Sequence, residues 1–195
     1  METLQPPFRR GRPADAAILA ELVNYAGEGL PLHLWSGMAG PGESAWDVGV
    51  ARAGRETGGF SYRNAIMIEA NGAAAGCLIG YAVPEAVEPI PPDIPPVVRP
   101  LLELENLAPG TWYVNALAVR PEARGHGLGA QLLGFAEEIG RAAAARGMSV
   151  IVADKNIRAF RLYERFGYRK VGERAMVKNG WPVESNNWLL MTKGF

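Results

Sequence analysis

The amino-acid sequence predicts a mixed α/β fold, and three observations support this prediction. Apolar runs of strand length recur along the chain, at 64–70, 74–83, 111–119 and 148–153. Apolar residues at helical spacing mark three further segments: 15–26, the stretch after Leu128 and the stretch after Asn156. From residue 111 onward the order is strand, helix, strand, helix, which favours a sheet with a central parallel pair.

Length and composition narrow the class of protein. The chain has 195 residues, with 20 Lys and Arg against 20 Asp and Glu, so its formal net charge is zero. We expect one domain over 1–195, with neither nucleic acid nor a membrane as partner. Cys77 is the single cysteine and there are two histidines, so we expect no intrachain disulfide and no metal site. The N-terminal segment has no apolar signal core, and we expect a cytoplasmic protein.

The first half of the chain has its own local signals. Asp15 is the expected N-cap of the helix at 15–26. Residues 27–60 are rich in glycine, and we expect a long connection with short helical pieces. The strands at 64–70 and 74–83 flank Asn71–Gly72, a strong hairpin-turn dipeptide. The second of these strands is almost wholly apolar and should be central in the sheet.

Residues 84–110 interrupt the pattern with a proline-rich insertion. Eight prolines exclude a central strand or a regular helix in its first part. The stretch VVRPLLELENL predicts a short helix with Pro100 in its first turn. An insertion of this length covers another part of the protein, binds a partner, or is a stiff surface excursion; the sequence leaves these open.

The second half alternates strands and helices. After the strand at 111–119, one helical face carries Leu128, Leu132, Phe135, Ala136 and Ile139, and Gly147 is the expected C-cap. After the strand at 148–153, Asn156 should cap a helix that Gly167 ends. Two last strands, in 168–178 and 188–195, flank a turn at Asn179–Gly180.

A glycine-rich loop lies between the strand at 111–119 and the following helix. Gly125, Gly127 and Gly129 alternate there, where the first helical N–H groups lack intrahelical partners. Together with the helix dipole this predicts an anion site, and Arg120 and Arg124 add positive potential. A tight turn without a ligand is the plainer alternative. No lysine follows the glycines, which excludes the nucleotide-triphosphate loop.

The same loop also satisfies a dinucleotide-binding pattern. Gly125, Gly127 and Ala130 fit G-x-G-x-x-G/A, and Asp154 closes the next strand. Five residues between Val119 and the first glycine count against it, as does the presence of a single strand–helix–strand unit. The residues that follow Asp154 belong to a motif that the dinucleotide-binding pattern does not explain, described next.

Two sequence motifs follow one another along the predicted strands and helices of the second half of the chain. The first, V-x-P-x-x-R-G-x-G-x-G, falls on Val119, Pro121, Arg124, Gly125, Gly127 and Gly129. The second, N-x-x-A-x-x-x-Y-x-x-x-G-Y, falls on Asn156, Ala159, Tyr163, Gly167 and Tyr168. In this order they resemble the GNAT superfamily of acyl-CoA-dependent N-acetyltransferases. The resemblance covers about 8–26 and 62–195 by element order, and its specific part is 112–168.

The resemblance implies a fold and a cofactor site. The fold would be a mixed central sheet of about six to seven strands, splayed at the cofactor site and flanked by about four helices. The loop amides would hold the pyrophosphate of acetyl-CoA, the preceding strand would bind the pantetheine arm, and the next helix would touch the cofactor. In this sequence the implied cofactor-binding residues are Leu117, Ala118, Val119, Arg124, Gly125, His126, Gly127, Leu128, Gly129, Ala130, Asn156 and Ala159.

The resemblance also implies a catalytic acid. Tyr163 matches the tyrosine near the thioester sulfur. A phenol has a pKa of about 10 and a thiol one of about 8.5, so Tyr163 would be a neutral proton donor at working pH, placed to protonate the leaving sulfur. From the residues alone, Tyr163 is equally a core aromatic at helical spacing. Many relatives carry a glutamate base at the position that Tyr113 occupies here, so the base is open. The candidate acceptor-binding residues are Tyr113, Asn115, Glu103 and Glu105; the two glutamates are alternatively solvated charges on a surface helix.

We therefore expect an N-acetyltransferase that transfers the acetyl group of acetyl-CoA directly to a primary amine of unknown identity, on a small molecule or a peptide. One alternative is a non-catalytic acyl-CoA-binding or sensing module, which the missing carboxylate at Tyr113 favours. The other is a dinucleotide-binding oxidoreductase. A homodimer stays open, since family members are often dimers and no segment of the sequence indicates an interface.

Overall fold

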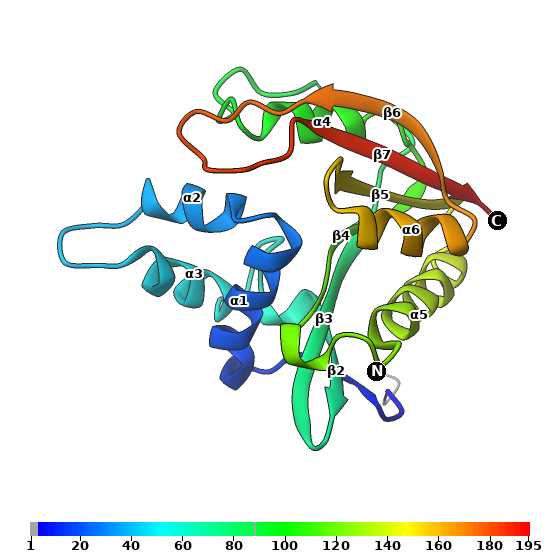
Figure 1. Cartoon of the computed structure of the whole chain (residues 1–195), viewed down its shortest axis with the longest axis horizontal. Coiled ribbons are helices and arrows are strands. Elements are labelled where there is room, and N and C mark those ends of the chain that lie inside the picture. Colours follow the sequence, from blue (N-terminus) through cyan, green and yellow to red (C-terminus); the bar gives the residue numbers. More distant parts are fainter. Residues whose placement is uncertain (1–3, 88) are drawn as a thin grey trace. The chain divides into compact units, whose positions relative to one another are not determined.

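A computed structural model describes residues 4–87 and 89–195 (Figure 1). In this described part the strands are β1 Phe8–Arg10, β2 Ala65–Ala70, β3 Ala73–Ala82, β4 Thr111–Val119, β5 Gly147–Ala153, β6 Arg169–Ala175 and β7 Asn187–Gly194. The helices are α1 Ala16–Ala26, α2 Leu30–Ser36, α3 Ala45–Ala53, α4 Arg99–Glu105, α5 Leu128–Ala142 and α6 Ile157–Arg165. None of the helices in these two ranges is long and apolar enough to span a bilayer.

The seven strands follow the order β1-β2-β3-β4-β5-β7-β6. The pair β4 and β5 is parallel, with register from Thr111↔Gly147 to Val114↔Val150. The pairs β1–β2, β2–β3, β5–β7 and β6–β7 are antiparallel. The expected mixed α/β sheet with one parallel pair is therefore confirmed. The structure has six helices where about four were expected, because short helices occupy the connection at 27–60.

The chain folds as two compact units. The first combines Met1–Gly80 with Ala116–Gly134, and the second combines Tyr81–Asn115 with Phe135–Phe195. Strand β4 contributes its first half to the second unit and its second half to the first. Each unit is described in turn.

The first unit contains the hairpin of β2 and β3. Asn71 and Gly72 have φ values of 52° and 76°, which only turn-forming residues adopt readily. The predicted hairpin turn is confirmed. Gly76 on β3 allows a close approach to β4, since a Cβ there would lie 2.6 Å from the carbonyl oxygen of Ala118.

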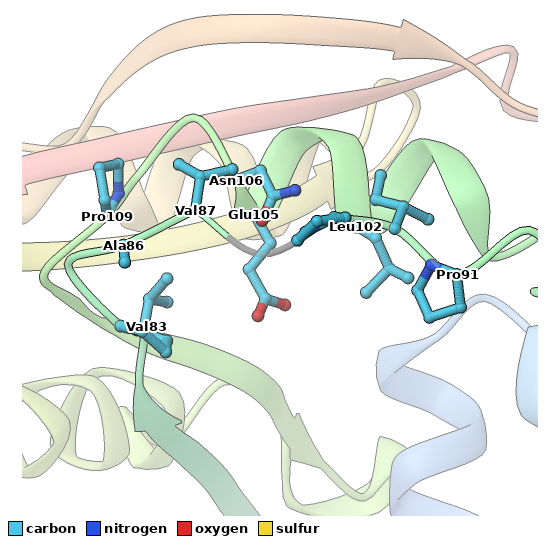
Figure 2. Close-up of a pocket in the computed structure, with 11 residues that line it drawn as sticks. Val83, Ala86, Val87, Pro91, Leu102, Glu105, Asn106 and Pro109 are labelled. Carbon is cyan, nitrogen blue, oxygen red and sulfur yellow. The ribbon is translucent and has the colours of Figure 1, made fainter.

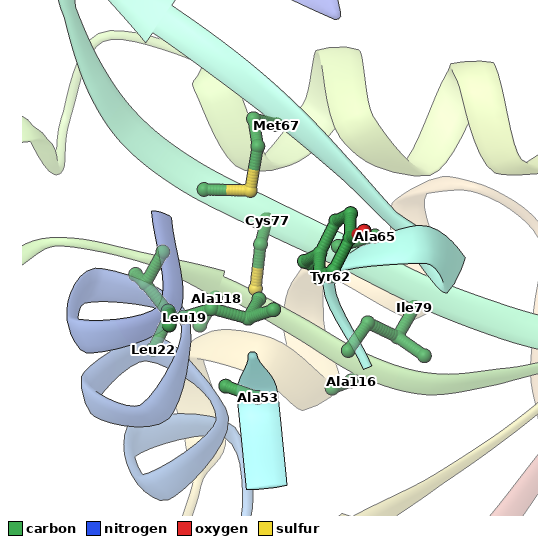
Figure 3. Close-up of a cluster of buried hydrophobic side chains, with 11 residues drawn as sticks. Leu19, Leu22, Ala53, Tyr62, Ala65, Met67, Cys77, Ile79, Ala116 and Ala118 are labelled. Carbon is green, nitrogen blue, oxygen red and sulfur yellow. The ribbon is translucent and has the colours of Figure 1, made fainter. Parts of the chain in front are cut away.

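Helix α1 packs its apolar face into the core of the first unit (Figure 3). Leu19 and Leu22 are fully buried against β2 and β3, where Met67 and Cys77 are also fully buried. Burying one such leucine stabilises the fold by about 1.5–3 kcal/mol. Small residues let the elements approach closely; those in this cluster are Ala16, Ala53, Ala65, Ala116 and Ala118.

Helices α2 and α3 form the helical pieces expected in the 27–60 connection. Ser44 and Asp47 form a capping box that starts α3. Trp35 is buried and stacks on Phe60, with ring centroids 5.7 Å apart. Gly49 makes room for that indole, because a Cβ at position 49 would lie 2.5 Å from the Trp35 ring.

Asp15 differs from its expected role. It occupies the N-cap position of α1, but its side chain makes no capping hydrogen bond to that helix. Its carboxylate accepts hydrogen bonds from the Arg9 guanidinium, at 2.7 and 2.9 Å, and from the Arg12 amide, at 2.7 Å. Asp15 therefore ties the chain before α1 to β1 rather than capping the helix.

In the second unit the insertion folds over β6. Pro100 lies in the first turn of α4, as expected. Leu104 of α4 and Leu107 just beyond it pack toward Gly172 of β6, where a Cβ would approach them to 3.4 and 3.3 Å. The ends of the insertion are joined at a neck: the Val83 amide donates to the Thr111 carbonyl at 2.8 Å, and the Gly110 amide donates to the Val83 carbonyl at 3.1 Å.

The predicted C-cap at Gly147 is wrong. Helix α5 ends at Ala142, and Ala144, with φ 54°, is the residue that leaves the helix in the left-handed region. Gly147 instead begins β5. A Cβ there would lie 2.2 Å from the Lys193 carbonyl oxygen, so close packing of β5 on β7 requires glycine.

The remaining helix cap, helix end and turn that the sequence predicts in the second unit are present. Asn156 caps α6, its side-chain oxygen accepting from the Ala159 amide at 3.1 Å. Gly167, with φ 88°, ends that helix. Asn179 and Gly180 form a positive-φ turn. That turn lies within the longer connection 176–186, and β6 and β7 pair only from Ala175↔Asn187.

The ion pair of Asp15 gives a test of stability against pH. Burial favours the neutral carboxyl, but hydrogen bonds from Arg9 and the Arg12 amide outweigh it and hold the Asp15 pKa below its ordinary value of 3.8. A lowered pKa stabilises the fold above the unfolded-state pKa, and this stabilisation is lost as pH falls through the folded-state pKa. Asp15→Asn is expected to lower the free energy of unfolding at pH 7 by about 1.5–3 kcal/mol.

Urea denaturation at pH 7, 5 and 3 measures this difference. The gap between wild type and Asp15→Asn should persist at pH 5 and narrow at pH 3. Asp93→Asn, at an exposed position of the insertion, is the control and should change little. A gap that is equally large at pH 3 contradicts the assignment.

Candidate active site

The glycine loop lies in the first unit, between β4 and the start of α5. A short 3₁₀ turn, Pro121–Ala123, leads into it. Gly125 and Gly127 have φ values of 90° and 77°, and a Cβ at either position would meet no atom within 4 Å. Glycine is needed there for its backbone conformation, while the space above the loop stays open.

The loop presents backbone donors to this open space. Residues 124–127 are exposed, and α5 begins at Leu128. The first hydrogen bond into the helix runs from the Gln131 amide to the Gly127 carbonyl, at 3.1 Å. The amides before Gln131 in the first helical turn have no carbonyl one turn earlier to bond. Such an array of amides favours an anion, since the helix dipole adds to the attraction for negative charge.

Side chains around the loop hold it in place. Arg124 folds back, donating from Nε to the Val119 carbonyl at 3.0 Å, with its guanidinium 5.7 Å from the Tyr25 ring centroid. His126 is exposed, its Nδ1 lying 3.3 Å from the Ala123 carbonyl oxygen. Arg120 forms ion pairs with Glu21 and Glu122. Arg124 and His126 therefore have structural contacts, and their amides remain part of the loop.

Leu117–Val119 lead along β4 into this loop. Ala118 is buried, whereas Leu117 and Val119 are half-buried. These residues follow the last pair of the β4–β5 register, Val114↔Val150. The segment is thus a partly accessible length of strand that ends at the glycine loop.

A cluster of polar aromatic groups lies in the second unit. Tyr113 is 5% exposed, and its ring meets that of Tyr81 edge to face, with centroids 5.4 Å apart. The exposed side chain of Asn115 lies close enough to both phenols to lower their pKa, against the larger effect of burial. Tyr163 is close enough to Tyr113 to influence its pKa. Three residues predicted from sequence, Tyr113, Asn115 and Tyr163, are therefore brought together.

Glu105 joins this cluster, whereas Glu103 does not. The Tyr81 hydroxyl donates to the Glu105 carboxylate at 2.8 Å. Burial raises the Glu105 pKa above its ordinary value, and the hydrogen bond from Tyr81 opposes part of that rise. Glu103 forms an ion pair with Arg174 at 2.9 Å, which joins α4 to β6.

Tyr81 is a site residue that the sequence did not single out. It stands at the end of β3, directly before the insertion, and is 39% exposed. Burial of its hydroxyl end, together with Tyr113 and Glu105, raises its pKa. The signal available in the sequence was a polar aromatic residue ending an otherwise apolar strand.

Residues 43–168 match the sequence profile of the acetyltransferase (GNAT) family, and they make up more than half of the chain. The chain belongs to the GNAT family. A curated acetyltransferase of Agrobacterium fabrum is 35% identical over 84 residues, which are 43% of this chain and 58% of that relative. The chain thus aligns with somewhat more than half of that relative's length.

Solved structures share the GNAT fold. An N-acetyltransferase from Staphylococcus aureus Mu50 superposes with a TM-score of 0.64 at 17% identity, covering 95% of this chain and 99% of that one. A GNAT family acetyltransferase from Elizabethkingia anophelis with acetyl-CoA bound gives a TM-score of 0.50 at 17% identity, covering 67% and 75% of the two chains. At these identities the likeness shows the fold.

The dinucleotide alternative is wrong for this GNAT chain. Asp154, the acidic residue which that alternative would use, accepts hydrogen bonds from the Asn186 and Asn187 amides, at 3.1 and 3.0 Å. It fixes the start of β7. Cys77 also has a packing role: it is fully buried, which raises its thiol pKa to about 12.

Helix α6 carries the second GNAT motif. Asn156 and Ala159 meet at the N-cap of this helix through the hydrogen bond described above. Tyr163 lies on its buried face, 6% exposed, with its ring centroid 5.8 Å from that of Tyr168. Burial raises the Tyr163 pKa, so the phenol keeps its proton at neutral pH.

Residues of the insertion of this GNAT protein, together with Val83 just before it, line a pocket (Figure 2). Its volume is about 140 Å³, and its lining includes Val83, Ala86, Val87, Pro91, Leu102 and Pro109. The Glu105 carboxylate points from α4 into this pocket (Figure 2). Its walls are therefore mostly aliphatic, with one carboxylate in contact with Tyr81.

The Tyr81–Glu105 hydrogen bond predicts a change in a measurable pKa. Tyr81→Phe is expected to raise the Glu105 pKa further, because the variant loses a donor that stabilises the carboxylate. Carboxyl ¹³C chemical shifts, followed in an NMR pH titration, measure the change. Tyr25→Phe removes a comparable hydroxyl donor to Glu21 and should leave Glu105 unaltered. A lower Glu105 pKa in Tyr81→Phe would show that the bond is absent in solution.

Proposed function

We propose that this chain is an N-acetyltransferase that transfers the acetyl group of acetyl-CoA directly to a primary amine. The observation that carries the proposal is a buried, protonated phenol, Tyr163, in the same cluster as the carboxylate of Glu105. Acetyl transfer to an amine needs one group that gives a proton and one that takes it, and this cluster contains both kinds. Family membership supports the same reaction.

The proposal assigns the acyl donor to the glycine loop and the motif residues. Amides of Arg124–Ala130 would hold the pyrophosphate, because Gly125 and Gly127 leave the space above the loop open. The backbone of Leu117–Val119 would bind the pantetheine arm as an added strand does. Asn156 and Ala159 would contact the donor from the start of α6. Acetyl-CoA supplies the acetyl group as a thioester and leaves as a thiol.

The acceptor must lose a proton before it can attack. A typical alkylammonium has a pKa of about 10.4, so about one molecule in a few thousand is neutral at pH 7. Tyr113 stands where many family members carry a glutamate, and buried phenols accept protons poorly. Glu105 is the carboxylate in reach of this cluster, and its raised pKa makes it a better proton acceptor than an exposed glutamate.

The departing sulfur must gain a proton. When the amine nitrogen bonds to the acetyl carbon, the carbon–sulfur bond breaks and its electron pair stays on sulfur. Tyr163 would donate its hydroxyl proton there. The nitrogen then releases its second proton, which returns to the Tyr163 phenolate, and the proton that Glu105 took before the attack passes to solvent. Since burial raises the Tyr163 pKa, the phenol is protonated before the reaction, and its phenolate is a base strong enough to take up the proton released from nitrogen.

The direct test is an acetyl-CoA-dependent thiol-release assay over a diverse library of primary amines. Turnover with at least one amine supports the proposal. Tight binding of acetyl-CoA without turnover of any amine favours the non-catalytic sensing module instead, for which the replacement of a carboxylate by Tyr113 is the supporting observation.

Tyr163→Phe tests the acid. It removes one hydroxyl and keeps the ring, so kcat should fall by about 10²–10⁴-fold while the Kd of acetyl-CoA stays the same. Tyr168→Phe is the matched control, because the Tyr168 hydroxyl is buried on the neighbouring ring with no hydrogen-bond partner among the described residues. Unchanged kcat in Tyr163→Phe would remove Tyr163 from the mechanism.

Gly127→Ala tests the donor loop. A left-handed backbone costs a non-glycine residue about 1–2 kcal/mol, so the Kd of coenzyme A should rise about tenfold in calorimetry. Gly42→Ala is the control, since Gly42 has φ 79° and similarly open surroundings in a different loop. An equal effect of the two variants on coenzyme A binding would contradict a role for the loop conformation.

A further inference from the structure

We propose that the pocket formed by the insertion binds a compact aliphatic primary amine without a carboxylate, and that Glu105 holds its ammonium group. This inference rests on the proposed function, because it names the class of acceptor that the same site takes. It concerns residues of the second unit only.

The walls of the pocket determine the body of the ligand. Apart from Glu105 and Asn106, the described lining residues are aliphatic residues and prolines, among them Val87, Ile90, Leu102 and Pro109, and none is aromatic. Such walls favour a branched aliphatic body over a polar one, because contact removes apolar surface from water. Proline fixes its own φ, so the walls lose little conformational freedom when a ligand binds.

The charge in the pocket determines the head group. Glu105 is the one charged residue among the described lining residues. Neighbouring carboxylates already have cations: Glu103 pairs with Arg174, and Glu85 pairs with Arg146. Glu105 forms no ion pair within the described part of the chain, and its carboxylate accepts a hydrogen bond from the neutral Tyr81 hydroxyl. A half-buried carboxylate with an apolar pocket before it attracts a cation with an apolar body.

The position of Glu105 determines the orientation of the ligand. Its other contact, Tyr81, meets Tyr113, which interacts with Tyr163. An ammonium group on Glu105 therefore faces the tyrosine cluster while the aliphatic body fills the insertion. A ligand carboxylate would be repelled by Glu105, and a second ammonium group would lie among mostly aliphatic walls with no second carboxylate among the described lining residues.

A matched set of small probes tests this assignment without acetyl-CoA. The probes are isopentylamine; isopentyl alcohol, which lacks the charge; leucine, which adds a carboxylate; and 1,4-diaminobutane, which adds a second charge. NMR titrations of the full chain give each Kd. Isopentylamine should bind at least tenfold more tightly than leucine and 1,4-diaminobutane.

Three variants locate the binding. Glu105→Gln should weaken isopentylamine at least tenfold and leave isopentyl alcohol unchanged. Glu103→Gln, on the same helix but paired with Arg174, should leave both unchanged. Ala86→Phe places a ring in the pocket from an exposed position and should weaken both. Circular dichroism confirms that each variant folds.

The outcomes separate this inference from the proposed function. If Glu105→Gln weakens amine and alcohol equally, or if Ala86→Phe leaves amine binding intact, the pocket assignment is overturned. If the binding pattern holds but no amine is acetylated, the assignment stands and the proposed function fails. If acetylation occurs with polar diamines or amino acids and not with isopentylamine, the function stands and this inference fails.

Discussion

Strand β4 is the constraint on which the candidate site depends. Its first half is fixed by parallel pairing with β5 and carries Tyr113 and Asn115 in the second unit. Its second half, Leu117–Val119, belongs to the first unit and runs directly into the glycine loop. Because strand side chains alternate, the register of this one strand decides which residues face the tyrosine cluster. A slip by one residue would turn Tyr113 and Asn115 to the opposite face and move the start of the loop.

Desolvation gives the tyrosine cluster its chemical character. Burial raises the pKa of Tyr113, Tyr163 and Glu105 together, since a low-dielectric surrounding disfavours every charged form. The phenols remain neutral donors, and the carboxylate becomes a stronger base. One physical cause therefore favours a proton donor and a proton acceptor in the same cluster, and the Tyr81 hydrogen bond opposes part of the rise in the Glu105 pKa.

The sequence predicted what depends on local geometry. The glycine loop, the Asn156 cap and the Asn71–Gly72 turn follow from backbone requirements within a few residues, and the structure has all three. The roles of Asp15, Gly147 and Tyr81 depend on segments far away in the chain. Asp15 meets Arg9, Gly147 meets β7, and Tyr81 meets Glu105 across the insertion. Glu103 and Glu105 looked equivalent in sequence, and their partners in the fold distinguish them: Arg174 for Glu103 and Tyr81 for Glu105.

The neck of the insertion has an evolutionary consequence. Hydrogen bonds join Val83 to Thr111 and Gly110 to Val83, so the two ends of the segment between them are held together at the edge of the strands. The segment is thus a separate module. The entropy of closing such a loop grows only slowly with its length. Residues 84–110 can therefore be exchanged, lengthened or shortened while β3 and β4 keep their places. If the chain acts as proposed, acceptor preference can diversify within this module while the glycine loop, which lies outside it, keeps its role in donor recognition.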